Sequence, residues 1–169
     1  LEQKIIQWSQ TDPKGHKRTN VNGWHSKTDM NQKEEYNPLT IELFNMQEEI
    51  YQKEHLNRKP ELGNMWANVN YPGGYNRPHL HHNSLFSGVY WVKAPEKSGN
   101  LMLYEPRQGV QCTMPNRKEV QLPPELWREV HYQPRAGTAV MFPAWLWHEV
   151  KLNESNDTRI SVSFNFLQR

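Results

Sequence analysis

The pattern of hydrophobic and polar positions divides the chain near residue 65. Beyond that point, short runs rich in β-branched and aromatic residues alternate with Pro, Gly and Asn, a texture typical of strands joined by turns. The pattern predicts strands over residues 65–71, 85–93, 100–104, 129–132, 138–142, 146–152 and 158–166. So many short strands within about one hundred residues indicate a β-sandwich or a β-barrel.

The first sixty residues are polar and rich in turns, and residues 11–15 and 20–23 are typical of loops. One apolar face stands out, because hydrophobic side chains recur at steps of four, three and four in a segment rich in Glu and Gln. These side chains are Leu39, Leu43, Met46 and Ile50. They predict one amphipathic helix over residues 38–56. We expect residues 1–169 to form one domain, in which residues 1–60 wrap around a β-core at 65–167.

Two of the predicted strands carry polar side chains along one face. In residues 158–166 the polar positions are Arg159, Ser161, Ser163 and Asn165, and each alternates with an apolar residue. In residues 65–71, Asn68 and Asn70 alternate with Ala67 and Val69 in the same way. Such a face either meets water on the outside of a sheet or lines a polar pocket inside a barrel.

Composition and charge make several classes of protein and of metal site improbable for this chain. A length of 169 residues suits one ordinary domain, and 20 Lys and Arg against 18 Asp and Glu leave a net charge of +2. That balance disfavours dedicated nucleic-acid binding. Cys112 is the only cysteine, which excludes an intramolecular disulfide and a zinc site built from several cysteines. With no apolar run near the roughly 20 residues of a membrane span and no secretory signal at Leu1, we expect a cytoplasmic protein without membrane contact.

Histidines supply the candidate chemistry. In an extended segment, His79 and His81 point to the same side, and His148 follows a distant aromatic-rich turn. A histidine-rich loop alone is more often a plain surface loop, and Arg159 alone is more often a surface ion-pair residue. Imidazole is, however, a common ligand for zinc, iron and nickel, so two histidines on one side plus a third indicate a mononuclear metal site.

Several motifs occur in a definite order along the chain. They are Asn68, the YPGG run at 71–74, His79-Leu80-His81, the LFSGVYWV run at 85–92, GNL at 99–101, GTAVMFP at 137–143, then His148, and finally Arg159-Ile160-Ser161. This order resembles that of the iron(II)- and 2-oxoglutarate-dependent oxygenases. It is most similar to a prolyl-hydroxylase-like branch encoded by phages and marine bacteria. For a phage-encoded protein the expected location is the host cytoplasm.

The resemblance implies a mainly β fold, a double-stranded β-helix of the jelly-roll or cupin-like type, with a helical N-terminal segment. It also implies that His79 and His148 bind the metal and that Arg159 pairs with the distal carboxylate of 2-oxoglutarate. The planar guanidinium suits that role because it binds a carboxylate bidentately. Ser161 lies on the same strand face, and Asn68 and Tyr90 are further candidates for the same pocket.

The second metal ligand departs from the common family pattern. Most such enzymes have a carboxylate two residues after the first histidine, but this chain has His81 there. We rank His81 first as the ligand, with Glu105 and His82 as alternatives. Three neutral imidazoles suit zinc at least as well as ferrous iron, because affinity alone favours zinc.

The resemblance therefore predicts a dioxygenase that binds Fe(II), 2-oxoglutarate and O2, converts 2-oxoglutarate to succinate and CO2, and hydroxylates an unknown prime substrate. The alternative is a cupin-like barrel that binds zinc or nickel and has no oxygenase activity. An exposed sheet edge or the N-terminal helix offers a surface for a homodimer.

Overall fold

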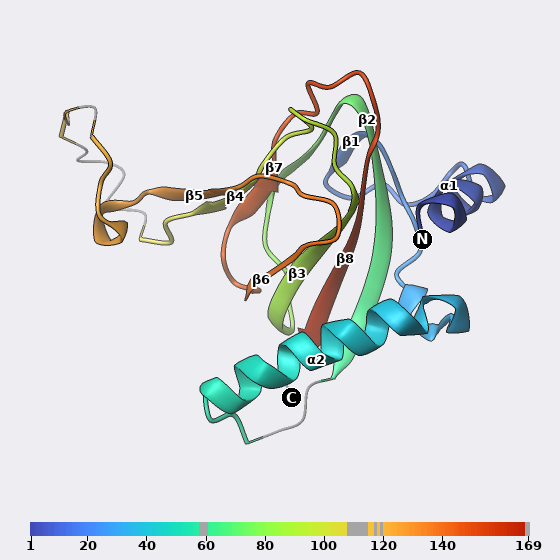
Figure 1. Cartoon of the computed structure of the whole chain (residues 1–169), viewed down its shortest axis with the longest axis horizontal. Helices are drawn as coiled ribbons and strands as arrows, with labels where there is room; N and C mark the ends of the chain where they lie inside the picture. Colours follow the sequence, from blue (N-terminus) through green and yellow to red (C-terminus); the bar gives the residue numbers. More distant parts are fainter. Residues whose placement is uncertain (58–60, 108–114, 117, 119, 168–169) are drawn as a thin grey trace.

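The computed structural model describes residues 1–57, 61–107, 115–116, 118 and 120–167, so Cys112 lies outside the described residues. Antiparallel strands form one sheet with the order β5-β4-β7-β2-β8-β3-β6, and β1 pairs with β2 beside this path. The sheet curls into a half-barrel (Figure 1). The strands are β1 (Asn20–His25), β2 (Leu62–His79), β3 (Ser84–Lys93), β4 (Leu101–Tyr104), β5 (Glu129–Tyr132), β6 (Ala139–Pro143), β7 (His148–Val150) and β8 (Arg159–Leu167).

All seven predicted strands are present, and β2 is much longer than predicted. It continues through residues 71–74, where the pairing with β1 jumps from Asn70 to Tyr75. Gly73 adopts a φ of 78°, which favours glycine, and its N–H donates to the Asn153 carbonyl at 2.7 Å. The segment that follows the predicted end of the strand at residue 71 is thus a bulge inside one strand, after which the chain returns to the sheet and carries His79.

The long strand β2 has different partners along its length. Its first part pairs with β8, where Asn68 lies opposite Ser161 and Asn70 lies opposite Arg159. Its last part pairs with β7, where His79 lies opposite His148. The strand β2 therefore connects the polar residues around Arg159 and Ser161 with the histidine pair His79 and His148.

Helices cover the outer face of the sheet, with α2 (Asn37–Lys53) running across the ends of β2, β8 and β3 (Figure 1). Leu43 is buried and Phe44 packs edge-on against Phe166 of β8 with ring centroids 5.6 Å apart. The predicted amphipathic face is confirmed. The apolar face of β8 is fully buried in this core through Ile160, Val162, Phe164 and Phe166.

Two elements of the N-terminal segment were not expected. The first is α1 (Glu2–Thr11), whose Ile5 is buried and whose Trp8 packs against Trp24. Its ten residues are too few for a clear periodicity. The second is β1, which we predicted as a loop because its Asn-Val-Asn-Gly start is typical of turns. Asn22 keeps a positive φ of 46°, but backbone pairing with β2 makes the segment a strand.

The remaining elements are short. In the part of the chain that the structure describes, three 3-10 helices connect the larger elements: η1 (Met30–Gln32), η2 (Glu34–Tyr36) and η3 (Pro124–Leu126). A second apolar cluster lies within the curl and consists of Val89, Trp91, Leu101, Leu103 and Phe142. Among the described residues, no helix combines the length and apolar character needed to cross a membrane.

Candidate metal centre

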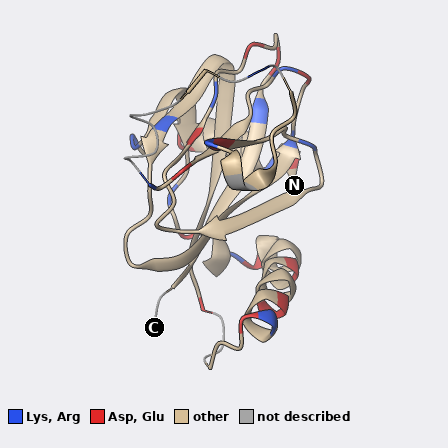
Figure 2. Cartoon of the chain, turned by 90° about the vertical axis from the view of Figure 1, so that its left-hand side faces the viewer, with Lys and Arg blue, Asp and Glu red and all other residues tan. Residues whose placement is uncertain are grey.

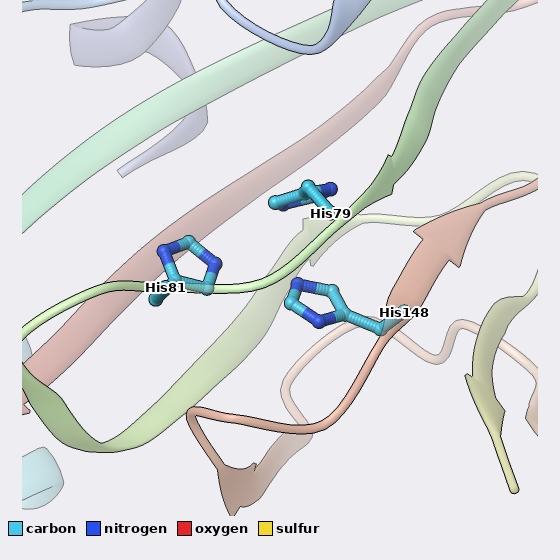
Figure 3. A group of neighbouring side chains, drawn as sticks. All are labelled: His79, His81 and His148. Atoms are coloured by element: carbon cyan, nitrogen blue, oxygen red, sulfur yellow. The ribbon is translucent and has the colours of Figure 1, made fainter. Parts of the chain in front are cut away.

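Three histidines from two separate parts of the chain converge within the curl of the sheet (Figure 3). His79 ends β2, His81 follows two residues later, and His148 begins β7. One nitrogen from each ring lies within 4.8 Å of the others. The ring centroids of His79 and His148 are 4.2 Å apart, as expected for residues directly opposite in an antiparallel pair. His81 is 5.1 Å from each, so the pair does point to one side.

Backbone carbonyls fix the tautomers of two rings. His79 Nδ1 lies 2.7 Å from the Arg77 carbonyl oxygen, and His148 Nδ1 lies 2.9 Å from that of Leu146. A carbonyl only accepts, so each Nδ1 carries the proton and each Nε2 keeps its lone pair. This arrangement is typical of histidines that bind metals. His81 has a different partner, the Asn165 side-chain amide, with Nδ1 3.4 Å from its nitrogen.

Burial keeps the three rings neutral. Desolvation is the main cause that lowers the pKa of His148 to about 3 and that of His81 to about 4, with nearby histidines adding repulsion. Desolvation also lowers the pKa of His79. Because a metal ligand must be deprotonated, the cluster offers available nitrogens at neutral pH.

The alternatives for the second ligand lie elsewhere. His82 is exposed and does not belong to the cluster. Glu105 makes two hydrogen bonds to the Arg107 guanidinium, at 2.8 and 2.9 Å, and is also outside the cluster. Among the described residues, His81 is therefore the histidine or carboxylate that joins His79 and His148.

Arg159 is buried on the inner face of β8 and lines the same cavity as the histidines, a space of about 290 Å³. Its Nη1 donates to the carbonyls of Ser98, Gly99 and Lys151. Its Nη2 is buried without a partner, and no described carboxylate forms an ion pair with it. Desolvation lowers its pKa to about 10, so the side chain remains a cation at neutral pH.

The polar strand faces line this cavity, which resolves the choice between an outer face and a pocket. Ser161 and Asn68 both line it. Asn68 Nδ2 donates to Ser163 Oγ at 3.1 Å, whereas its Oδ1 is buried without a partner. The cavity thus presents an unsatisfied acceptor and an unsatisfied cationic donor.

Tyr90 lies on the wrong face of β3 for the role we expected. It packs with the core beneath α2 and lines a groove there with Leu43 and Met46, while the cavity is lined by its neighbours Val89 and Trp91. Side chains alternate along a strand, so a shift of one residue moves a side chain to the opposite face.

Sequence reasoning missed several residues of the cavity wall. His25 and Trp66 stack with centroids 5.5 Å apart, and Trp66 in turn lies 5.8 Å from His81. Asn64 accepts from Asn165 at 2.8 Å. The alternation that identified Asn68 and Asn70 also includes Trp66 and Asn64, so the same signal extended by four residues would have found both.

The residues fit an iron ion with bound 2-oxoglutarate. Three neutral nitrogens at one point suit a divalent metal. In the same cavity, a buried guanidinium with no counter-ion among the described residues suits the distal carboxylate of a dicarboxylic acid, because an unpaired buried charge is costly. Both features arise from this chain's own side chains.

Comparisons with known proteins agree with this fit. The family model described as "Putative 2OG-Fe(II) oxygenase" matches residues 64–165, more than half of the chain. No curated protein gives a significant match. Among solved structures, a Pseudomonas putida prolyl-4-hydroxylase aligns with a TM-score of 0.67 and 17% identity over 100% of this chain and 84% of its own.

Two further structures share the fold. The non-heme alpha ketoglutarate dependent carbocyclase SnoK from nogalamycin biosynthesis aligns with a TM-score of 0.64 and 11% identity, over 99% of this chain and 76% of its own. An oxidoreductase of the 2OG-Fe(II) oxygenase family from Burkholderia pseudomallei aligns with a TM-score of 0.54 and 13% identity, over 71% of this chain. The alignment spans only 50% of the latter protein's length.

These likenesses confirm the expected jelly-roll fold of the double-stranded β-helix type. The family match over the β-core confirms the resemblance seen in the sequence motifs. The chain therefore belongs to the 2OG-Fe(II) oxygenase family, which uses Fe(II) and 2-oxoglutarate.

Proposed function

We propose that this chain is a 2-oxoglutarate-dependent dioxygenase that hydroxylates a prime substrate and converts 2-oxoglutarate to succinate and CO2. In this proposal His79, His81 and His148 hold Fe(II), and Arg159 holds the distal carboxylate of 2-oxoglutarate. The observation that carries the proposal is the presence of the histidine cluster and the uncompensated Arg159 in one cavity.

Iron, when bound, supplies the activation of O2 that couples decarboxylation of 2-oxoglutarate to oxidation of a C–H bond. The chain's own residues supply binding and orientation. The Nδ1–H groups of His79 and His148 donate to backbone carbonyls, which holds each ring with Nε2 free. Arg159 Nη2 offers a charge-assisted hydrogen bond to the carboxylate, and Ser161 on the same strand face offers a hydroxyl.

The apolar wall of the cavity has a separate role. Trp91 and Leu101 are both buried and line the cavity together with Arg159. They exclude water from the guanidinium and so strengthen its attraction for a carboxylate. We propose that this region holds the two methylene groups of 2-oxoglutarate.

The test separates metal binding from co-substrate binding. Under anaerobic conditions, Fe(II) plus 2-oxoglutarate should give the chain a weak visible charge-transfer band. His148→Ala should lose the metal. Arg159→Lys should keep it and weaken 2-oxoglutarate binding by about tenfold or more, because lysine lacks the planar guanidinium in which Nη1 holds backbone carbonyls while Nη2 stays available to the carboxylate. Absence of the band and of succinate under air with every substrate tried would exclude the dioxygenase.

One observation favours a second candidate, a metal-binding barrel without oxygenase activity. The cluster contains three histidines and no carboxylate among the described residues. Neutral ligands bind zinc more tightly than ferrous iron. Metal analysis of protein from cells decides between the two: the barrel predicts stoichiometric zinc or nickel and no binding of 2-oxoglutarate.

A further inference from the structure

A cluster of cations lies beside the histidine cavity. Lys14, Lys17, Arg18 and Lys27 line a surface depression of about 450 Å³, which also contains the ring of His16. All four cationic side chains are exposed. Asp12 is the acidic residue of this depression, and no described carboxylate comes within ion-pair distance of the four cations.

The positive charge is concentrated rather than spread over the molecule. The whole chain carries a net charge of only +2, and acidic residues gather elsewhere, for example along α2 (Figure 2). Like charges repel at short range, so four unpaired cations in one depression lower the free energy of an anion placed among them.

The depression adjoins the candidate active site. Arg18 lines both the depression and the histidine cavity. A row of rings follows the same path: His16 stacks on His25 at 6.2 Å, His25 on Trp66 at 5.5 Å, and Trp66 lies 5.8 Å from His81. Because His25, Trp66 and His81 all line the histidine cavity, this row of rings leads from the cations to the histidines.

Backbone contacts hold the basic loop in place. The His16 N–H donates to the His25 carbonyl at 2.8 Å, and the Arg18 N–H donates to Asn20 Oδ1 at 2.8 Å. The Arg77 N–H on β2 donates to the Thr19 carbonyl at 3.0 Å. The loop is thus tied to both strands that border the cavity, which reduces the entropy lost when a ligand binds.

We infer that the prime substrate is an organic anion. Its phosphate or carboxylate group binds among Lys14, Lys17, Arg18 and Lys27, and its uncharged part lies along the rings towards the histidines. In the proposed function Arg159 binds 2-oxoglutarate, so the anionic group of the prime substrate uses a separate set of cations. The inference rests on the proposed function, because it assigns the second substrate of that same site.

Anion binding tests the inference without turnover. The full chain is loaded with Zn²⁺ and saturating 2-oxoglutarate, which keeps probes away from Arg159, and is titrated with glycerol 3-phosphate or with glutarate. We expect saturable binding of at least one probe, with amide NMR shifts concentrated in residues 14–18 and 27. The tighter probe identifies the anionic group as phosphate or carboxylate.

Matched variants locate the site. Arg18→Gln should weaken binding by about tenfold, and the double change Lys17→Glu and Arg18→Glu should abolish it, because charged hydrogen bonds are lost. Lys53→Gln on α2 removes the same charge far from the depression and should leave binding unchanged. Equal effects of Arg18→Gln and Lys53→Gln, or shifts scattered over lysines elsewhere, would overturn the inference.

Failure of the proposed function has a different signature. Zinc stoichiometry and the 2-oxoglutarate affinity of the unmodified chain are measured on the same samples. If either is missing, the dioxygenase proposal fails, whatever the anion probes show. If both are present and neither probe saturates, only the assignment of an anionic prime substrate fails.

Discussion

At the scale of single residues, the site depends on side chains that burial keeps in one ionisation state. Arg159 remains charged because its ordinary pKa is so high that desolvation leaves it at about 10. The histidines become neutral because their ordinary pKa lies close to neutrality, so a modest desolvation cost is enough to remove the proton. The same cavity therefore holds a permanent cation and a set of neutral ligands.

The lowered pKa values of the buried histidines predict how the stability of the metal-free chain depends on pH. Burial lowers the pKa of His148 to about 3 and that of His25 and His81 to about 4, from 6.5. Between about pH 4 and 6.5 the unfolded chain binds more protons than the folded chain. The free energy of unfolding therefore falls as the pH falls through this window, by about 2 kcal/mol per histidine between pH 7 and pH 5.

Urea unfolding at a series of pH values measures the slope of the free energy of unfolding against pH. His131→Gln serves as the control, because His131 is exposed on β5 and outside the cavity, and it should leave the slope unchanged. A free energy of unfolding that is constant from pH 7 to pH 5 would contradict the neutral, buried state of these rings.

At the scale of elements, alternation along strands was the most informative signal in the sequence. It separated the two faces of β8 correctly, with Phe164 in the core and Ser161 in the cavity. It could not place Tyr90, because strand pairing puts Trp91, not Tyr90, opposite Ser161. Pairing partners come from distant parts of the chain, which the local pattern of β3 does not contain.

The two elements that the sequence pattern did not predict, α1 and β1, depend on tertiary contacts. Isolated helices as short as α1 are marginal in water, and α1 is stabilised where Ile5 and Trp8 pack against the sheet. Likewise β1 exists because β2 offers it a pairing edge. The convergence of His79 with His148 required the register of β2 and β7, for which the spacing of 69 residues gave no direct evidence.

Packing between β3 and β8 leads to a prediction for Gly88. A Cβ at this position would lie 2.3 Å from the Phe164 ring and 2.8 Å from the Val140 carbonyl oxygen. Gly88→Ala should therefore lower the free energy of unfolding by about 1–3 kcal/mol, the usual cost of overpacking a core. Thermal or urea unfolding measures the loss.

A second substitution tests the cause of that loss. Phe164→Leu in the Gly88→Ala background removes the far end of the ring that the new methyl group meets. Part of the stability should return relative to the sum of the two single changes, as a double-mutant cycle shows. Strictly additive effects would mean that the clash is not with Phe164.

At the scale of the whole molecule, a bound metal would join two regions that the sheet connects only weakly. β7 is three residues long, and its register with β2 rests on two pairs, Asn76 with Val150 and His79 with His148. Ligands from β2 and β7 on one ion would add a link across this short ladder. Residues 64–70 of β2, by contrast, pair one after another with β8 and need no such link.

We therefore expect metal to stabilise the molecule unevenly. At a free Zn²⁺ concentration one hundred times the dissociation constant, the folded state should gain about 2.7 kcal/mol overall. Local opening at the end of β2 and in β7 should slow most, because these segments carry the ligands, while the pairing of β2 with β8 should change little. Amide hydrogen exchange with and without Zn²⁺ measures the protection of the two regions separately.

The variant His148→Gln, which lacks one of the three imidazoles, serves as the control. In this variant the added protection of Val150 should disappear, while exchange at Val162 of β8 should match that of the unmodified chain. Equal protection of both regions by Zn²⁺ would show that the ion binds outside the histidine cluster.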